Sequence, residues 1–474
     1  MTENRFFIKR QALIAFLLCG IASAAVGVYL NYPLMFDASN YYVFSQSFIS
    51  DGTFSFSNYM LNLRGYFFPL MFLGITIIGN VFGLMPGQSM AIFASFFAAL
   101  IFTVILPGFY IRKNTLKTFF LRLFLFAVFM LFWSDLVYYP LSDLWGFGLA
   151  LLAAVAFKAM LTKEKPLGRQ WALAFLAGGA LYAAYNTRTI YLFIVPLFLV
   201  VYLAFALKKK YRFLTLALSA VMIFAGMAAV CWPQILVNAH HFQTLSPMVN
   251  TVVGQEQTLY TGQIKAGLAI SRYETMAPMA DTGLKGALYF VDDAGEQLSE
   301  TFQNAINAGW MGLIRFCVKH MFDLIGIYMR HFINILCVPF NHVYLTSLNH
   351  LNNVFMLISY TLTFFSGVFV VQTLAKKTER KKAFREPQTW LLMMILVVCA
   401  AILPGIVELR FFLPMYSMIY AIFIFECLNA DYFKRIWQKK WRYLLLYIII
   451  LFVLVAVWSN TFANGDPTDV FLQW

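Results

Sequence analysis

Most of the chain consists of apolar stretches of about 20 residues, separated by short polar segments. An α-helix rises about 1.5 Å per residue, so a helix of about 20 apolar residues can cross the hydrocarbon core of a membrane. The pattern predicts eleven such helices, over residues 11–30, 89–111, 116–133, 141–158, 171–186, 189–207, 213–233, 351–374, 389–407, 411–428 and 443–460. The predicted fold class is therefore an all-α polytopic membrane protein.

The composition agrees with this fold class and argues against nucleic acid as a partner. Hydrophobic residues make up 61% of the 474 residues and charged residues only 12%, which is more apolar surface than a soluble domain can bury. The net charge of +14 collects at the ends of the predicted spans, so it indicates membrane topology and predicts no nucleic acid as a partner.

The charges also decide how residues 66–83 are interpreted. This apolar stretch could be a further span, but the cluster Arg112, Lys113, Lys117 and Arg122 would then lie outside. As a re-entrant or interfacial helix it leaves 26 of the 35 Lys and Arg residues inside and 15 of the 21 acidic residues outside. The positive-inside rule favours this second arrangement. It predicts a cytoplasmic N-terminus with a retained first span rather than a cleaved signal peptide, and an external C-terminal tail.

Three regions follow from this topology. Residues 1–233 form an N-terminal transmembrane module that includes a first external loop, residues 31–88. Residues 234–350 form one large external region, and residues 351–474 form the C-terminal transmembrane helices. The second half of the external region alternates apolar and basic positions, as in amphipathic helices that lie along the outer leaflet. A further pair of short spans is the alternative.

The first external loop carries the most informative acid. Asp37 lies a few residues beyond the first span, is followed by several aromatic residues, and precedes Arg64 and an apolar run that opens with Pro69. An acid at the mouth of a membrane helix, under a half-buried amphipathic segment, is suited to chemistry on a lipid-linked substrate. The alternative is that Asp37 caps the N-terminus of the helix that follows it.

A second external turn, WSDLVYYPLSDLWGF, contains Asp135 and Asp143. Pro140 and Ser142 mark the start of a helix whose first turn includes Asp143, where an acid stabilises the helix by about 0.3–1 kcal/mol. The same stabilising role, or a solvated one, is the alternative to substrate binding for both acids.

Two more external turns carry arginines. Arg188 lies in the short turn YNTRTIYLF, where so few cations are external that a fixed anionic partner is expected rather than lipid phosphate. Glu408 and Arg410 lie in the turn PGIVELRFFLPMY. An internal salt bridge between them is one alternative; the shortness of the turn favours Arg410 pointing at a substrate or at an acid from another loop.

Acids and arginines at the outer ends of spans suit the transfer of a sugar from a polyprenyl phosphate. The leaving phosphate must be held, and arginine binds phosphate oxygens through a planar fork that stays charged. The acceptor hydroxyl is a poor nucleophile and needs a carboxylate base. Asp37 is the candidate base, and the candidate substrate-binding residues are Arg64, Asp135, Asp143, Arg188, Glu408 and Arg410.

In order along the chain, FDASNYY, RGYFFPL, YPLSD, NTRT and ELRFFLP resemble the motifs of the C-type glycosyltransferase superfamily, which includes aminoarabinose transferases and protein O-mannosyltransferases. The resemblance implies that Asp37 is the base, Asp143 a second acid of the sugar site, and Arg188 and Arg410 the donor-phosphate ligands. Members of the superfamily often have a second acid where Ala38 stands. The WWD-type signature and a large soluble C-terminal domain are both missing, which argues against asparagine-linked glycan transfer and a metal-dependent mechanism.

The predicted function is that of an inverting glycosyltransferase of the cytoplasmic membrane with its active site on the outer face. Its expected partners are a polyprenyl-monophosphate sugar donor, a glycan or lipid acceptor and membrane lipids. No metal-ligand spacing occurs in the sequence, so no cofactor is predicted and a divalent metal is not indicated.

Two other interpretations stay open. An O-antigen polymerase or ligase would use polyprenyl-diphosphate glycans and basic residues of the large external region, with Arg315, His320, Arg330 and His331 as candidates. A lipid or glycan transporter would need ionisable groups near the middle of the bilayer.

Overall fold

The computed structural model describes residues 5–59, 63–111, 113–162, 166–208, 213–253, 257–275, 287–339, 344, 350–428, 432, 440–463 and 465–468. Over these residues the chain is mostly helical, with three small sheets. It divides into two compact units, Met1–Asn250 with Gln372–Val398 (unit 1) and Thr251–Val371 with Cys399–Trp474 (unit 2). Parts of four predicted inner basic clusters, at residues 112, 163–165, 209–212 and 434–439, lie outside the described residues.

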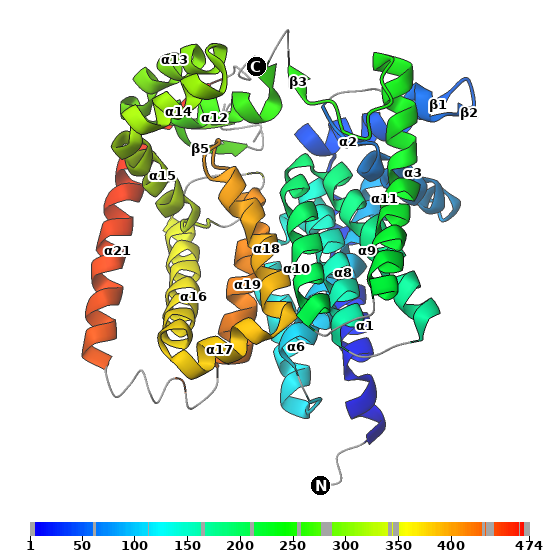
Figure 1. Cartoon of the computed structure of the whole chain (residues 1–474). Helices are drawn as coiled ribbons and strands as arrows, with labels where there is room; N and C mark the ends of the chain where they lie inside the picture. The colour runs from blue at the N-terminus through cyan, green and yellow to red at the C-terminus, as the bar shows by residue number, and fades with distance from the viewer. Residues whose placement is uncertain are drawn as a thin grey trace. The chain divides into compact units, whose positions relative to one another are not determined.

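Unit 1 holds the predicted N-terminal module (Figure 1). Its elements are α1 (Arg5–Leu30), α2 (Phe36–Gln46), β1 (Ile49–Ser50), β2 (Thr53–Phe54), η1 (Phe56–Asn58), α3 (Phe67–Val81), α4 (Pro86–Ala99), η2 (Leu100–Ile105), α5 (Pro107–Tyr110), α6 (Leu116–Trp133), α7 (Asp135–Tyr138), α8 (Ser142–Thr162), α9 (Leu167–Thr187), η3 (Thr189–Phe193), α10 (Ile194–Lys208), α11 (Phe213–Phe242) and α17 (Lys377–Arg385).

Unit 2 combines the region after α11 with the C-terminal helices. Its elements are β3 (Val252–Val253), β4 (Gln257–Thr258), α12 (Leu259–Ala269), β5 (Ile270–Thr275), β6 (Ala287–Val291), α13 (Asp293–Asn307), α14 (Gly309–Lys319), α15 (Met321–Ile335), η4 (Leu409–Phe412), α19 (Leu413–Ile422), η5 (Phe423–Cys427), α21 (Lys440–Ala463) and β7 (Gly465–Thr468). The helices α16 (His350–Ala375) and α18 (Pro387–Ile402) each continue from one unit into the other.

The apolar helices identify a multi-pass membrane protein. Within the described residues, nine helical segments are long and apolar enough to cross a membrane: Arg10–Leu30, Pro86–Tyr110, Leu116–Trp133, Ser142–Leu161, Thr189–Lys208, Phe213–Phe242, Asn352–Ala375, Leu409–Cys427 and Trp441–Thr461. The pair α17 and α18, bent by 83°, would make a tenth. The predicted span 171–186 lies in α9, which is less apolar because polar residues such as Gln170 and Asn186 lie near its ends. The predicted count of eleven is therefore unconfirmed over the described residues.

The stretch predicted as re-entrant or interfacial forms α3. This helix has 15 residues, which rise about 22 Å, whereas the hydrocarbon core is about 30 Å thick. It is therefore too short to cross alone. It packs mainly against α2 and α4 and also touches α9, so it lies beside the helix whose first turn contains Asp37.

Glycines allow α9 and α11 to pack with their backbones in close contact. The two helices run side by side in Figure 1, with α8 on the other side of α9. A Cβ on Gly178 would overlap the backbone carbonyl of Ile223, and one on Gly226 would overlap that of Phe175. Small residues at helix interfaces permit this approach between apolar helices.

The Gly178→Ala variant is expected to lose about 1–3 kcal/mol of unfolding free energy, because the added methyl group clashes with backbone atoms of the neighbouring helix. The measurement is the unfolding midpoint of the purified protein in detergent. Gly74→Ala is the matched control: Gly74 lies inside α3 with nothing within 4 Å of the added Cβ, so this variant should be neutral or slightly more stable. Equal midpoints for the two variants would contradict the close packing.

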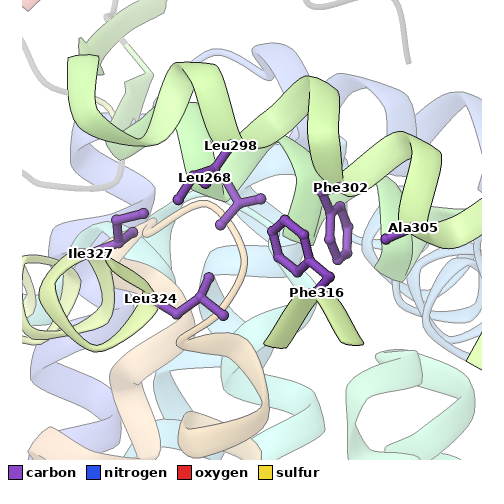
Figure 2. Close-up of a cluster of buried hydrophobic side chains, with 7 residues drawn as sticks. All are labelled: Leu268, Leu298, Phe302, Ala305, Phe316, Leu324 and Ile327. Atoms are coloured by element: carbon purple, nitrogen blue, oxygen red, sulfur yellow. The ribbon is translucent and has the colours of Figure 1, made fainter. Parts of the chain in front are cut away.

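The helices α12 to α15 and the strands β5 and β6 form a module within unit 2. The strand β6 pairs antiparallel with β5 and, on its other edge, with β7, which follows the last span. One hydrophobic core joins the four helices, and Figure 2 shows its buried side chains: Leu268, Leu298, Phe302, Ala305, Phe316, Leu324 and Ile327. On α13 the buried residues recur every three or four positions, which is the spacing of one helix face.

The two helices α14 and α15 keep a continuous apolar face exposed. Trp310 is 82% exposed and Phe322 is 81% exposed, and exposed basic residues such as Arg315 and Lys319 accompany them. The face consists of Trp310, Met311, Ile314, Val318, Met321, Phe322, Ile325, Met329 and Phe332. Helices thus form where amphipathic helices were predicted, and at 11 and 15 residues they are too short for the alternative of two further spans. Their place along the outer leaflet stays a prediction.

Candidate functional site

Asp37 lies at a conformationally unusual start of a helix. It is in the first turn of α2 and is partly buried. Phe36, directly before it, has φ +47°, in the left-handed region that bulky residues rarely adopt and that costs about 1–3 kcal/mol. Such strain concentrates at functional sites. The helix cap is Met35 rather than Asp37, so the expected alternative role as N-cap is not what this residue does.

Tyr41 ties α2 to the start of α8. Its hydroxyl lies 2.8 Å from the Oγ of Ser142, and its ring packs edge-on against Phe68 of α3 with centroids 4.8 Å apart. Residues four apart on a helix share a face, so Asp37 lies on the side of α2 that faces this contact. The residue after Ser142 is Asp143, so the contact of Tyr41 joins α2 to the first turn of α8, where the second predicted acid lies.

Asp143 and Arg188 form an ion pair across the ends of α8 and α9. The Nη1 of Arg188 contacts the Oδ1 of Asp143, and their side chains are 19% and 4% exposed. The side chain of Arg188 also runs past Gly146 of α8, where a Cβ would lie 3.5 Å from its Cγ. The anionic partner expected for Arg188 is therefore Asp143, and the pair fixes the orientation of the guanidinium.

Asp135 is buried, with 6% exposure, in the first turn of α7. The expected solvated role is therefore excluded for this acid. The pKa of Tyr139 and that of Tyr32 are both raised, mainly by burial and further by the nearby charge of Asp135. The ring centroids of Tyr32 and Tyr139 lie 5.0 Å apart. Asp135 thus lies among phenols that keep their protons at neutral pH and can act as hydrogen-bond donors.

Arg64 lies on a loop that is fastened to the end of α9. The hydroxyl of Tyr59 donates to the backbone oxygens of Arg64 and Gly65 at 3.3 and 3.1 Å. Gly65 lies so close to Asn186 that a Cβ would overlap it, and Asn186 Oδ1 accepts from the backbone N–H of Phe67 at 2.8 Å. Since Asn186 precedes Arg188 by two residues, the loop with Arg64 lies beside the turn with Arg188.

A buried amide chain supports this loop and was not predicted from the sequence. Asn186 Nδ2 donates to Gln234 Oε1 at 2.8 Å, and Gln234 Nε2 donates to Asn238 Oδ1 at 3.1 Å. Asn238 Nδ2 in turn donates to the backbone oxygens of Ser246 and Met248 at 2.7 Å. The signal was present in the sequence, because Gln234 and Asn238 are polar residues four apart at the end of an apolar helix.

Glu408 and Arg410 belong to unit 2 and pair with each other. Arg410 Nε lies 2.6 Å from Glu408 Oε1, and its Nη2 donates to Oε2 at 3.1 Å. The structure thus contains the internal salt bridge, where Arg410 was expected to point at a substrate or at another loop. The backbone explains this: Glu408 is extended and the 3₁₀ turn η4 begins directly after it, which brings side chains two apart together.

The basic residues of the polymerase interpretation lie in the α12–α15 module. His331 is fully buried, with Nδ1 2.9 Å from the backbone oxygen of Leu403, and burial lowers its pKa. Arg330 is bound to Asp292, and His320 Nδ1 lies 3.4 Å from Asp323. Arg315 is exposed. A buried neutral histidine cannot reach a substrate, which weakens this interpretation.

No group of three or more His, Cys, Asp or Glu residues that could hold a metal ion occurs among the described residues. Neither the protein-family models nor the curated proteins contain a match to this chain. The function must therefore be argued from the site itself.

The residues of unit 1 supply three chemical capabilities. Asp37 is a partly exposed carboxylate that can accept a proton. Arg188 is a guanidinium held in one orientation by Asp143, suited to bind anionic oxygens. Asp135 and the phenols around it add acceptors and donors for hydroxyl groups.

Proposed function

We propose that this protein is an inverting membrane glycosyltransferase that takes a sugar from a polyprenyl monophosphate. The acceptor is a lipid-linked glycan, a surface polysaccharide or lipid A, on the outer face of the cytoplasmic membrane. Asp37 is the general base, and Arg188, with Arg64 beside it, binds the donor phosphate. Asp143 and Asp135 bind the sugar side of the site.

In the proposed reaction an acceptor hydroxyl attacks the anomeric carbon of the donor sugar. The new glycosidic C–O bond forms as the bond from the anomeric carbon to the phosphate oxygen breaks, and polyprenyl phosphate leaves with both electrons. The hydroxyl proton passes to the carboxylate of Asp37. A single in-line displacement inverts the configuration at the anomeric carbon.

One observation carries the proposal: Tyr41, four residues after Asp37 on α2, contacts Ser142, which directly precedes Asp143 of the Asp143–Arg188 pair. A general base must lie near the hydroxyl it deprotonates, and a leaving phosphate needs a pre-oriented cation. The strained Phe36 adds support, because strained backbone residues cluster at active sites and ligand clamps. The charged residues at helix ends, rather than at helix centres, also support an enzyme over a transporter.

The proposal is tested with purified protein in lipid nanodiscs and a panel of polyprenyl-monophosphate sugars and polyprenyl-diphosphate glycans. The expected result is that a monophosphate donor is consumed, with release of polyprenyl phosphate and an inverted product or, without acceptor, slow hydrolysis. Consumption of diphosphate-linked glycans alone would replace the proposal with a polymerase or ligase. Passage of intact donor across a vesicle membrane, without cleavage, would replace it with a transporter.

A further inference from the structure

A cavity of about 290 Å³ lies within unit 2 where the end of α21 meets the α12–α15 module. None of its residues belongs to the proposed transferase site of unit 1. Six of its eight lining residues are polar, and the lining comes from β5, β6, the start of α13, α15 and α21: Ser271, Val291, Asp292, Asp293, Ala294, Arg330, Asn460 and Thr461. Three of the polar residues, Ser271, Asp292 and Thr461, are more than nine-tenths buried.

The charged part of the lining is rigid. Arg330 binds Asp292 through two parallel contacts, Nε to Oδ2 at 2.7 Å and Nη2 to Oδ1 at 2.9 Å. The backbone N–H of Asp292 donates to the oxygen of Ala269 at 2.7 Å. A fork of this kind fixes both side chains, so the carboxylate of Asp292 is presented to the cavity in one orientation.

Both hydroxyl groups of the lining already donate a hydrogen bond to another group of the protein. Ser271 Oγ lies 3.1 Å from the backbone oxygen of Phe290, which can only accept, so the hydroxyl donates. Thr461 Oγ1 donates to Asn334 Oδ1 at 3.1 Å. A hydroxyl has one proton, and both oxygens can therefore only accept from a ligand.

The cavity thus offers both acceptors and donors. Ser271, Thr461 and the carboxylates of Asp292 and Asp293 accept, while Arg330 and the amide of Asn460 donate. The two carboxylates and one guanidinium leave a net charge of −1 at neutral pH, which disfavours a phosphate or carboxylate ligand. The guanidinium also disfavours a metal ion, in agreement with the absence of a three-residue metal cluster among the described residues.

We propose that this cavity binds an uncharged sugar residue. A sugar ring presents several hydroxyl groups on a compact frame, each able to donate and to accept a hydrogen bond, which matches a lining that offers both kinds of partner. The volume is at the low end of small-molecule pockets, about 300–1,000 Å³, and suits one ring rather than an extended chain. The proposal goes beyond the transfer reaction and does not depend on it, because binding is measured without a donor.

The test measures binding by saturation-transfer NMR and calorimetry on the full-length protein in nanodiscs. The panel contains methyl glycosides of common hexoses and N-acetylhexosamines, the matching hexose 1-phosphates, spermidine and Ca²⁺. An uncharged glycoside is expected to bind with little salt dependence, and the phosphate to bind more weakly. Asp293→Ala and Asn460→Ala, both at exposed lining residues, should each lower the affinity by about tenfold for a lost charged or amide hydrogen bond.

The matched control is Glu296→Ala, which removes another exposed acid of α13 that does not line the cavity. It should leave the affinity unchanged. The proposal is overturned if no uncharged glycoside binds the folded protein, or if binding survives the combined Asp293→Ala and Asn460→Ala changes. Tighter binding of the phosphates, or binding of spermidine or Ca²⁺ alone, overturns it as well. None of these outcomes bears on donor cleavage, so failure here is distinct from failure of the proposed function.

Discussion

The Asp37→Asn variant is expected to bind the sugar donor with nearly unchanged affinity and to turn it over about 10²–10⁴-fold more slowly. The asparagine amide has the shape of the carboxylate, but it cannot take up the proton of the substrate hydroxyl. Since Asp37 lies in the first turn of α2, loss of its charge costs about 0.3–1 kcal/mol of helix stabilisation, and the protein should stay folded. The measurement is single-turnover donor consumption at saturating donor, together with a direct binding titration.

Asp51→Asn is the matched control for this result. Asp51 is an exposed acid of the same loop, at the turn between β1 and β2 with φ +50°, a conformation that asparagine adopts readily. Its turnover should equal that of the unaltered protein. Normal turnover by a folded Asp37→Asn protein would remove Asp37 from the reaction.

Arg188→Gln is expected to lower both the unfolding midpoint and the turnover. The change leaves Asp143, only 4% exposed, as an unpaired charge in a buried place, and breaking a buried pair costs about 3–5 kcal/mol. Removing both charges, in the Asp143→Asn and Arg188→Gln double variant, should restore most of the midpoint, because neutral groups carry no such penalty. Turnover should stay low in the double variant, since the leaving phosphate has lost its cation.

This cycle separates a substrate-binding pair from a structural one. Recovery of turnover along with the midpoint would mean that the pair only stabilises the fold. Arg169→Gln serves as the control, because Arg169 is an exposed arginine near the start of the same helix α9. Its midpoint and turnover should both be unchanged.

The sequence predicted where the charged residues lie along the chain better than it predicted their partners. Apolar runs and basic clusters placed Asp37, Asp143 and Arg188 at helix ends, and the structure has them there. The predicted span 171–186 forms the helix α9 but stays unconfirmed as a span, because this helix, packed between two others, contains glycine and amides that would be costly toward lipid. Hydropathy averages over all faces of a helix and does not record which face is covered.

Partners depend on tertiary contacts that periodicity does not contain. The need of Arg188 for an anion was predictable, but the choice of Asp143 required the packing of α8 against α9. For Arg410 the partner is local rather than distant. The pair with Glu408, two residues away, was not the favoured prediction, because it depends on the turn that follows Glu408. The link from Tyr41 to Ser142 was missed, since a tyrosine and a serine 101 residues apart leave no common pattern.

The strand β7 imposes an order on the biogenesis of unit 2. It follows α21 in the sequence, yet it forms the edge of the sheet whose other strands, β5 and β6, are synthesised long before. The pairing of β6 with β7 can therefore form only after α21 has been synthesised. The residues that follow α21 must also have reached the side of the membrane on which β6 lies. Until then the free edge of β6 needs shielding, and a fusion placed directly after α21 would compete with this late step.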